Sequence, residues 1–137
     1  MQPISVPTIP LNDAIARVTL FREQMVKSEA VPESNIPRAI LIPINDLMAI
    51  VEKYSTINED GTITSSLKGV RAYFAIKATD MDLPDDVTAL IVPVDLKGDD
   101  IITTPASSIG IGLETEIYDF TVPCPTECDT DSPLYIP

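Results

Sequence analysis

Two segments of the chain place apolar side chains three and four residues apart, the spacing that lines one face of a helix. The first stripe consists of Leu11, Ala14, Val18, Phe21 and Met25, and the second of Leu47, Ile50, Val51 and Tyr54. Asn45 suits the N-cap of the second segment. The pattern therefore predicts amphipathic helices over residues 11–29 and 44–54, each with one face to bury.

Residues 69–77 (GVRAYFAIK) alternate between apolar and polar positions, which predicts a strand. Val70, Ala72, Phe74 and Ile76 share one face, while Arg71 lies on the other. Such alternation is typical of a half-buried strand, so we expect the apolar face to be covered.

Two shorter apolar runs predict further strands. Residues 38–43 (RAILIP) are bounded by proline and favour a short buried strand. Residues 87–95 (VTALIVPVD) are apolar almost throughout, as in a central strand. Pro93 donates no backbone hydrogen bond, so we expect it at a bulge or near the strand end. Residues 114–120 allow one more short strand.

These elements predict an α+β fold in which two amphipathic helices pack on one face of a small, mostly antiparallel sheet. Residues 1–137 suit a single domain, because the chain has no repeat and is long enough for one core. Proline-rich residues 1–10 predict an extended arm. Residues 118–137 predict an irregular segment with four prolines and both cysteines, whose apolar residues should pack back on the domain or on a second copy.

Charge narrows the classes of partner. The net charge is −12, and beyond Lys97 the chain contains eight acidic residues and no base. Such a surface repels phosphate, so we expect no nucleic-acid partner and no binding to anionic membranes. A cationic partner, a divalent metal or a basic face of another copy stays compatible with this charge.

The sequence contains no run of about 20 apolar residues, the length that a bilayer needs. Its first ten residues, MQPISVPTIP, lack the basic and apolar regions of a signal peptide. We therefore expect a cytoplasmic protein, where two cysteines would normally be reduced.

Most catalytic motifs are missing. The chain has no histidine, which excludes Ser-His-Asp triads, Cys-His pairs and His-ligated metals. Residues 56–67 imitate part of a calcium-binding loop, yet Thr56 and Leu67 replace its first and last carboxylates. A turn in which Gly61 adopts a positive φ explains this stretch better. We predict no cofactor and no catalytic residue.

Cys124 and Cys128 admit three interpretations. Their spacing of four can close a disulfide across a turn. It is not the spacing of zinc ribbons, so a metal would need further ligands, such as Asp119 or Asp129, or a second subunit. The third interpretation is a pair of plain thiols packed in a turn that proline stiffens.

Charged side chains suggest two weaker sites. Asp129 and Asp131, with Asp119 and Glu127 nearby in sequence, could supply oxygen ligands to a cation, although acids in a terminal segment are usually just solvated. Arg71 could anchor a carboxylate, including one from the acidic C-terminal segment, if its face of the strand is covered.

Three stretches, LIPINDLMAIV, GVRAYFAI and IYDFTVPCPTECDTDSPL, carry a family resemblance. They are similar to small bacterial proteins of the Bacteroidetes type that end in a PCPxxCD…SPL signature. The resemblance extends over most of the chain from Arg38 onward. It implies no activity, because none is assigned to that group.

The sequence favours a non-enzymatic module that acts by association, as a homodimer or with a protein partner. The two apolar helix stripes and a sheet edge are the surfaces that association would use. The alternative is a small ligand- or cation-binding protein or enzyme that works through carboxylates, with Arg71 as anion anchor.

Overall fold

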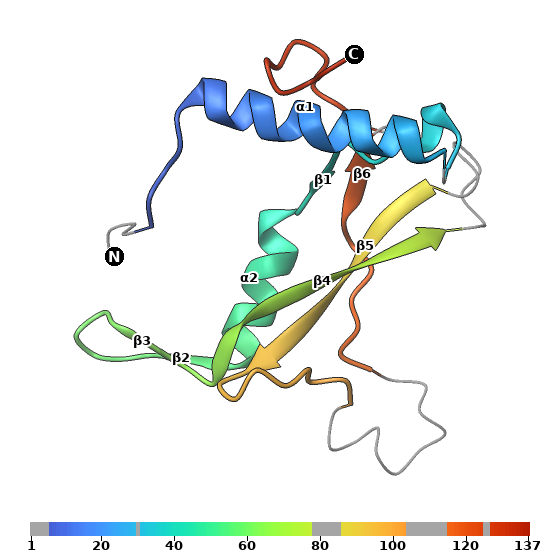
Figure 1. The fold of residues 1–137 in the computed structure, drawn as a ribbon. Helices are drawn as coiled ribbons and strands as arrows, with labels where there is room; N and C mark the ends of the chain where they lie inside the picture. The colour runs from blue at the N-terminus through green and yellow to red at the C-terminus, as the bar shows by residue number, and fades with distance from the viewer. Residues whose placement is uncertain (1–5, 30, 78–85, 104–114, 125–126) are drawn as a thin grey trace. The chain divides into compact units, whose positions relative to one another are not determined.

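The computed structural model describes residues 6–29, 31–77, 86–103, 115–124 and 127–137 (Figure 1). The elements follow in the order α1 (Leu11–Ser28), η1 (Glu33–Asn35), β1 (Ala39–Leu41), α2 (Ile44–Lys53), β2 (Ser55–Ile57), β3 (Ile63–Ser65), β4 (Leu67–Lys77), β5 (Asp86–Asp95) and β6 (Val122–Cys124). Within these ranges the strands form three two-stranded sheets, β1–β6, β2–β3 and β4–β5. The α+β class is confirmed, whereas the packing of both helices on one sheet face stays a prediction.

The chain divides into two compact units that interleave along the sequence. The first consists mainly of the described parts of Ile42–Ala75 and Ala89–Thr121. The second consists of the described parts of Pro3–Leu41, Ile76–Thr88 and Val122–Pro137. Each unit thus draws on distant stretches of sequence.

Both helices lie where the apolar spacing predicts them. α1 ends at Ser28, and Glu29 follows in the left-handed conformation, with a φ of 54°. α2 begins at Ile44, with Pro43 at its N-cap position and no side-chain cap. The predicted cap by Asn45 is therefore wrong: Pro43 already has the extended conformation that precedes a helix, so Asn45 lies inside the first turn.

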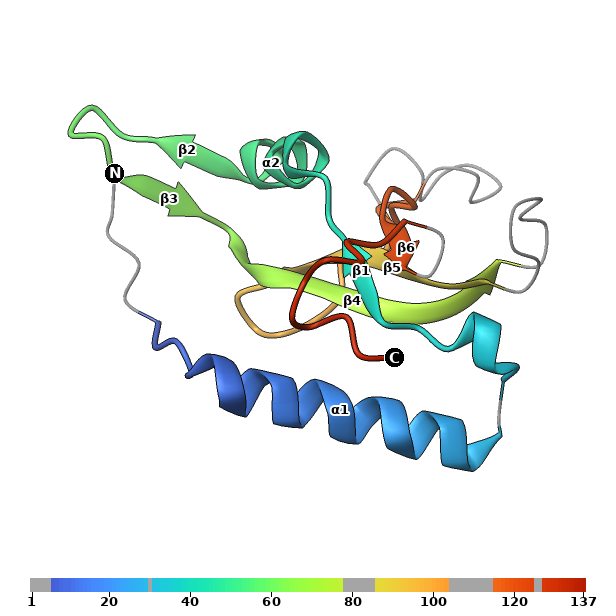
Figure 2. The ribbon, with the colours of Figure 1, turned by 90° about the horizontal axis from the view of Figure 1, so that it is seen from above.

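A hairpin absent from the sequence predictions joins α2 to β4. Thr56 of β2 lies opposite Thr64 of β3, and the two strands are antiparallel. The turn closes by a hydrogen bond from the Asn58 N–H to the Thr62 carbonyl, 2.8 Å long, and Gly61 has a φ of 86°. The positive φ at Gly61 is confirmed, and the paired strands replace the loop on which a calcium site would depend. The hairpin projects beyond β4 (Figure 2).

β5 forms the core of the first unit. Ile91, Val92 and Val94 are buried, as a run of apolar residues predicts. β4 lies alongside β5, and other segments bond to it as well: the Ile91 N–H and carbonyl bond to Tyr118, and the Ile101 N–H bonds to Pro93. Since successive residues of a strand direct their backbone groups to opposite sides, β5 has neighbours on both edges.

β4 departs from the sequence prediction. Its apolar face, expected to be covered, is exposed: Val70 keeps 37% of its surface, Phe74 78% and Ile76 59%. Alternation decides which side chains share a face, but it does not supply a layer to cover that face. In the part of the chain that is described, β5 is the only strand that pairs with β4.

In the second unit, two segments that are distant in sequence pair with each other. β1 pairs antiparallel with β6, with Ile40 opposite Pro123, so two segments 83 residues apart in sequence form one ladder. Cys124, which pairs with Ala39 in this ladder, is buried, and so is Ile36. Residues 115–120, part of the segment that allowed a short strand, contribute only the isolated bridge of Tyr118, while the true strand, β6, begins at Val122.

Candidate functional site

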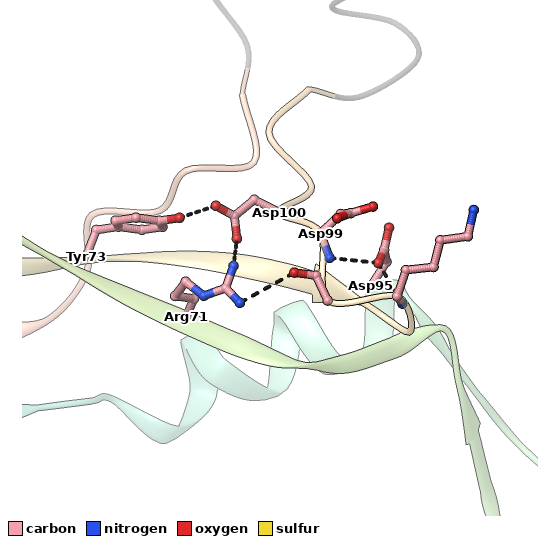
Figure 3. Close-up of polar contacts among 7 residues, drawn as sticks. Arg71, Tyr73, Asp95, Asp99 and Asp100 are labelled. Carbon is pink, nitrogen blue, oxygen red and sulfur yellow. Dashed lines mark hydrogen bonds and ion pairs between the residues drawn. The ribbon is translucent and has the colours of Figure 1, made fainter.

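Arg71 and Tyr73 lie on one face of β4 and meet the carboxylate of Asp100 (Figure 3). Arg71 Nη1 donates to Asp100 Oδ1, and the Tyr73 hydroxyl donates to Oδ2 of the same group. Arg71 Nη2 also donates to the Gly98 carbonyl at 3.4 Å. Hydrogen bonding with Tyr73 and the charge of Asp100 raise the pKa of Arg71 above its usual value. The predicted anchor thus binds a carboxylate from the turn after β5.

The turn that supplies Asp100 is ordered by Asp95. Its Oδ1 accepts the N–H groups of Lys97 at 2.9 Å and of Asp99 at 3.0 Å. Gly98 has a φ of 94°, a conformation that glycine adopts at little cost. This turn directs Asp100 across to β4, so the charge of Arg71 is held on the polar face of the strand.

The opposite face of β4 has no charged side chain between Val70 and Phe74. Ala72 lies between Val70 and Phe74 on this face, and all three side chains are exposed. We call this set the β4 apolar face: Val70, Ala72 and Phe74. It adjoins an edge that pairs with no strand among the described residues. Proteins commonly cover an exposed apolar face beside an edge of this kind by contact with another chain.

The second unit contains an open groove of ≈ 520 Å³ between α1, β1 and the residues that follow β6. Its apolar lining includes Val18, Ile40, Leu41, Leu134 and Tyr135, with both cysteines beside them. Two exposed acids, Glu127 and Asp129, line it as well. We call this the C-terminal groove.

Arg38 holds the last residues of the chain in place. Its Nη1 donates to the Ile136 carbonyl, and its guanidinium lies 4.1 Å from the centre of the Tyr135 ring. Its backbone N–H bonds to the Cys124 carbonyl at 2.8 Å. The base that attaches the acidic chain end is therefore Arg38, which the sequence analysis did not single out.

The residues proposed as metal ligands take other positions. Cys124 and Cys128 form a disulfide with their Cα atoms 5.0 Å apart, so neither carries a thiolate. Asp119 and Asp131 are exposed, and Asp129 lines the C-terminal groove. Among the described residues, no three His, Cys, Asp or Glu side chains gather as metal ligands.

Glu116 is the ionisable residue that the sequence analysis missed. Only 1% of its surface is exposed, and both of its carboxylate oxygens have partners. Lys53 Nζ lies 2.5 Å from Oε1, and the Tyr118 hydroxyl donates to Oε2. Burial acts to raise the pKa of Glu116, but hydrogen bonds from Lys53, Tyr118 and Tyr54 outweigh it and lower that pKa. Burial, together with Glu116, raises the pKa of both Tyr54 and Tyr118 to about 12.

No protein-family model, no curated protein and no solved structure matches the chain. None of the described helices is long and apolar enough to cross a membrane. The cytoplasmic location stays a prediction.

Proposed function

We propose that the protein is a non-enzymatic association module that forms a homodimer through β4. The observation that carries this proposal is the exposure of the β4 apolar face, with Phe74 78% exposed beside an edge that pairs with no described strand. A soluble chain rarely leaves such a side chain and such an edge uncovered together.

The edge lacks two features by which proteins prevent pairing, namely short length and proline. β4 is 11 residues long and contains no proline. The charge of Arg71 is held on the other face by Asp100, so it does not interrupt the apolar face. A second strand could therefore add to this edge through backbone hydrogen bonds while its side chains cover Val70 and Phe74.

Charge favours this element as the contact between two copies. The chain as a whole carries −12, so two copies repel each other. β4 is the exception, because it contains three of the nine bases, Lys68, Arg71 and Lys77, and no acid. Association through β4 places the contact on a strand without acids of its own, where Asp100 is already bound by Arg71 and Tyr73. The overall charge disfavours a nucleic acid as the alternative partner.

Two copies of β4 are also complementary to each other. In an antiparallel pair centred on Ala72, Val70 of one copy lies opposite Phe74 of the other, and the two-fold axis repeats this contact. On the other face Arg71 lies opposite Tyr73 of the second copy, and each stays bound to Asp100 of its own copy. No base faces a base in this register, since Lys68 lies opposite Ile76.

The test compares Phe74→Ser with Ile63→Ser, a matched change at a β3 residue that is 59% exposed. Sedimentation velocity over a concentration series should show a dimer for the wild type and for Ile63→Ser. Phe74→Ser should weaken dimerisation about 100-fold or more, because the two-fold axis removes the buried ring twice. Circular dichroism checks that both variants fold.

A second measurement tests the register. Cysteines at Ala72 would face each other across the two-fold axis, with Cβ atoms about 4.5 Å apart in a non-hydrogen-bonded pair, the upper end of the separation that a disulfide spans. Ala72→Cys should therefore cross-link under mild oxidation, whereas Thr64→Cys on β3 should not. A wild type that stays monomeric at every concentration, or equal cross-linking of the two cysteine variants, would refute the proposal.

A further inference from the structure

We infer that the C-terminal groove is a binding site for an extended peptide segment of a partner protein, one in which basic residues alternate with apolar ones. The groove lies in the second unit and is a different surface from the β4 apolar face. The inference therefore stands apart from the proposed homodimer.

The walls of the groove are fixed by bonds that are already formed. The Cys124–Cys128 disulfide closes one side, and the β1–β6 ladder holds that side against residues 39–41. Arg38 holds Tyr135, another residue of the lining, through the Ile136 carbonyl and the Tyr135 ring. A site built in this way loses little conformational freedom when a ligand enters, which favours binding.

The lining selects an apolar ligand. Ile40, Leu134 and Tyr135 present carbon surface to a volume of ≈ 520 Å³, a size typical of ligand sites. Leu134 keeps 42% of its surface exposed and Leu41 keeps 53%, so apolar groups of a ligand would cover surface that now faces water.

The charge of the lining selects a basic ligand. Glu127 and Asp129 are both exposed, and neither takes part in an ion pair among the described residues. The one base in the described lining is Arg38, which is bound to the chain end. Two unpaired carboxylates on a chain of charge −12 attract cations, and the sequence beyond Lys97 offers no base to neutralise them.

The backbone favours an extended peptide over a compact ligand. β1 pairs with β6 along one edge and with no other described strand, while Ala39 and Leu41 are exposed. An extended segment can bond to such an edge and place alternate side chains on opposite sides. Its apolar side chains would then enter the groove, while its long, flexible basic side chains bend back to the exposed Glu127 and Asp129 of the same lining.

The experiment measures fluorescence anisotropy with a labelled peptide in which leucine alternates with lysine. Two counterparts replace lysine by serine or by glutamate. The measurement uses the full chain as wild type and as Phe74→Ser, so that loss of the proposed dimer does not alter its outcome. We expect the lysine peptide to bind to both proteins and the glutamate peptide to bind to neither.

Variants then locate the site. The double change Glu127→Gln and Asp129→Asn should weaken binding about fivefold, as expected for two exposed charge pairs. Asn at position 129 keeps an oxygen that can accept the Asp131 N–H, so the turn is retained. Leu134→Ser should weaken binding by a similar factor, whereas Glu59→Gln, a change at an exposed acid in the β2–β3 turn, should have no effect.

Three results would overturn the inference. The first is no binding of the lysine peptide at millimolar concentration. The second is equal affinity for the serine and lysine peptides, which would mean that charge plays no part. The third is an equal loss of affinity in the Glu59→Gln control, which would mean that the peptide responds to overall charge and not to the groove.

Discussion

At the scale of single residues, Glu116 links distant segments of the first unit. Its carboxylate is almost completely buried, and it accepts hydrogen bonds from Lys53 and Tyr118. A buried charge is stable only when its partners compensate for the water that it loses. The lowered pKa of Glu116 indicates that these partners favour the charged form.

Removing this charge should destabilise the fold. We expect Glu116→Gln to lower the free energy of unfolding by about 3 kcal/mol, because the amide cannot satisfy Lys53 and the tyrosines together. Urea unfolding followed by circular dichroism measures this difference. Glu23→Gln, at an exposed position of α1, serves as the control and should change stability by less than about 0.5 kcal/mol.

The same residue should give stability a dependence on pH. Because the pKa of Glu116 is lower in the folded chain than in the unfolded chain, the unfolded state binds more protons between these two values. The contribution is fully present above the unfolded value of about 4.3 and is lost as the pH falls through the folded value. The stability difference between wild type and Glu116→Gln should therefore shrink below about pH 4.

At the scale of elements, the β2–β3 hairpin depends on the backbone of Gly61. Its φ of 86° lies in the left-handed region, and an added Cβ would meet no atom within 4 Å. The penalty of a side chain there is conformational and not steric. Asp60 supports the same turn by accepting the Thr62 N–H at 3.0 Å.

Two glycine substitutions separate these effects. Gly61→Ala should lower the free energy of unfolding by about 1 kcal/mol, since alanine disfavours the left-handed region. Gly69→Ala in β4, where space is equally open and φ is not left-handed, should leave stability unchanged or raise it slightly. Thermal unfolding of both variants is the measurement, and equal effects would contradict this explanation of the turn.

At the scale of the whole molecule, charge and apolar surface oppose each other. The net charge of −12 keeps copies apart, while the β4 apolar face draws them together. In the C-terminal groove the negative charge should instead attract the ligand, because that ligand is proposed to be basic. Salt should therefore act in opposite directions on the two surfaces.

We expect the proposed dimer to strengthen by a few fold when sodium chloride rises from about 20 to about 300 mM, as screening weakens the repulsion between the copies. Binding of the lysine peptide should weaken over the same range for the same reason. Sedimentation velocity and anisotropy at matched salt concentrations measure the two effects. A dimer that weakens with salt would show that attraction between charges, and not apolar contact, holds it.

The local elements were the most predictable part of the fold. α1 and α2 lie within one residue of their predicted bounds, and β5 begins one residue before its own. Helices and long strands repeat their pattern over many residues, so the signal is strong. β2, β3 and β6 have three residues each, which is too short for a period to emerge.

The candidate sites were predictable only in part. Cys124 and Cys128 were noted for a possible disulfide, because a spacing of four is compatible with one. Arg38 and Glu116 were missed, since nothing near them in sequence marks their roles. Their partners Ile136 and Lys53 lie 98 and 63 residues away along the chain.

The sequence by itself determined the positions of the long elements, the acidic surface and the lack of histidine chemistry, because these depend on residue identity and short-range spacing. Tertiary structure decided that the β4 apolar face is open to solvent, that Arg38 holds the chain end and that Glu116 is buried. Burial and pairing depend on which distant segments meet. The spacing of residues within one segment cannot encode that choice.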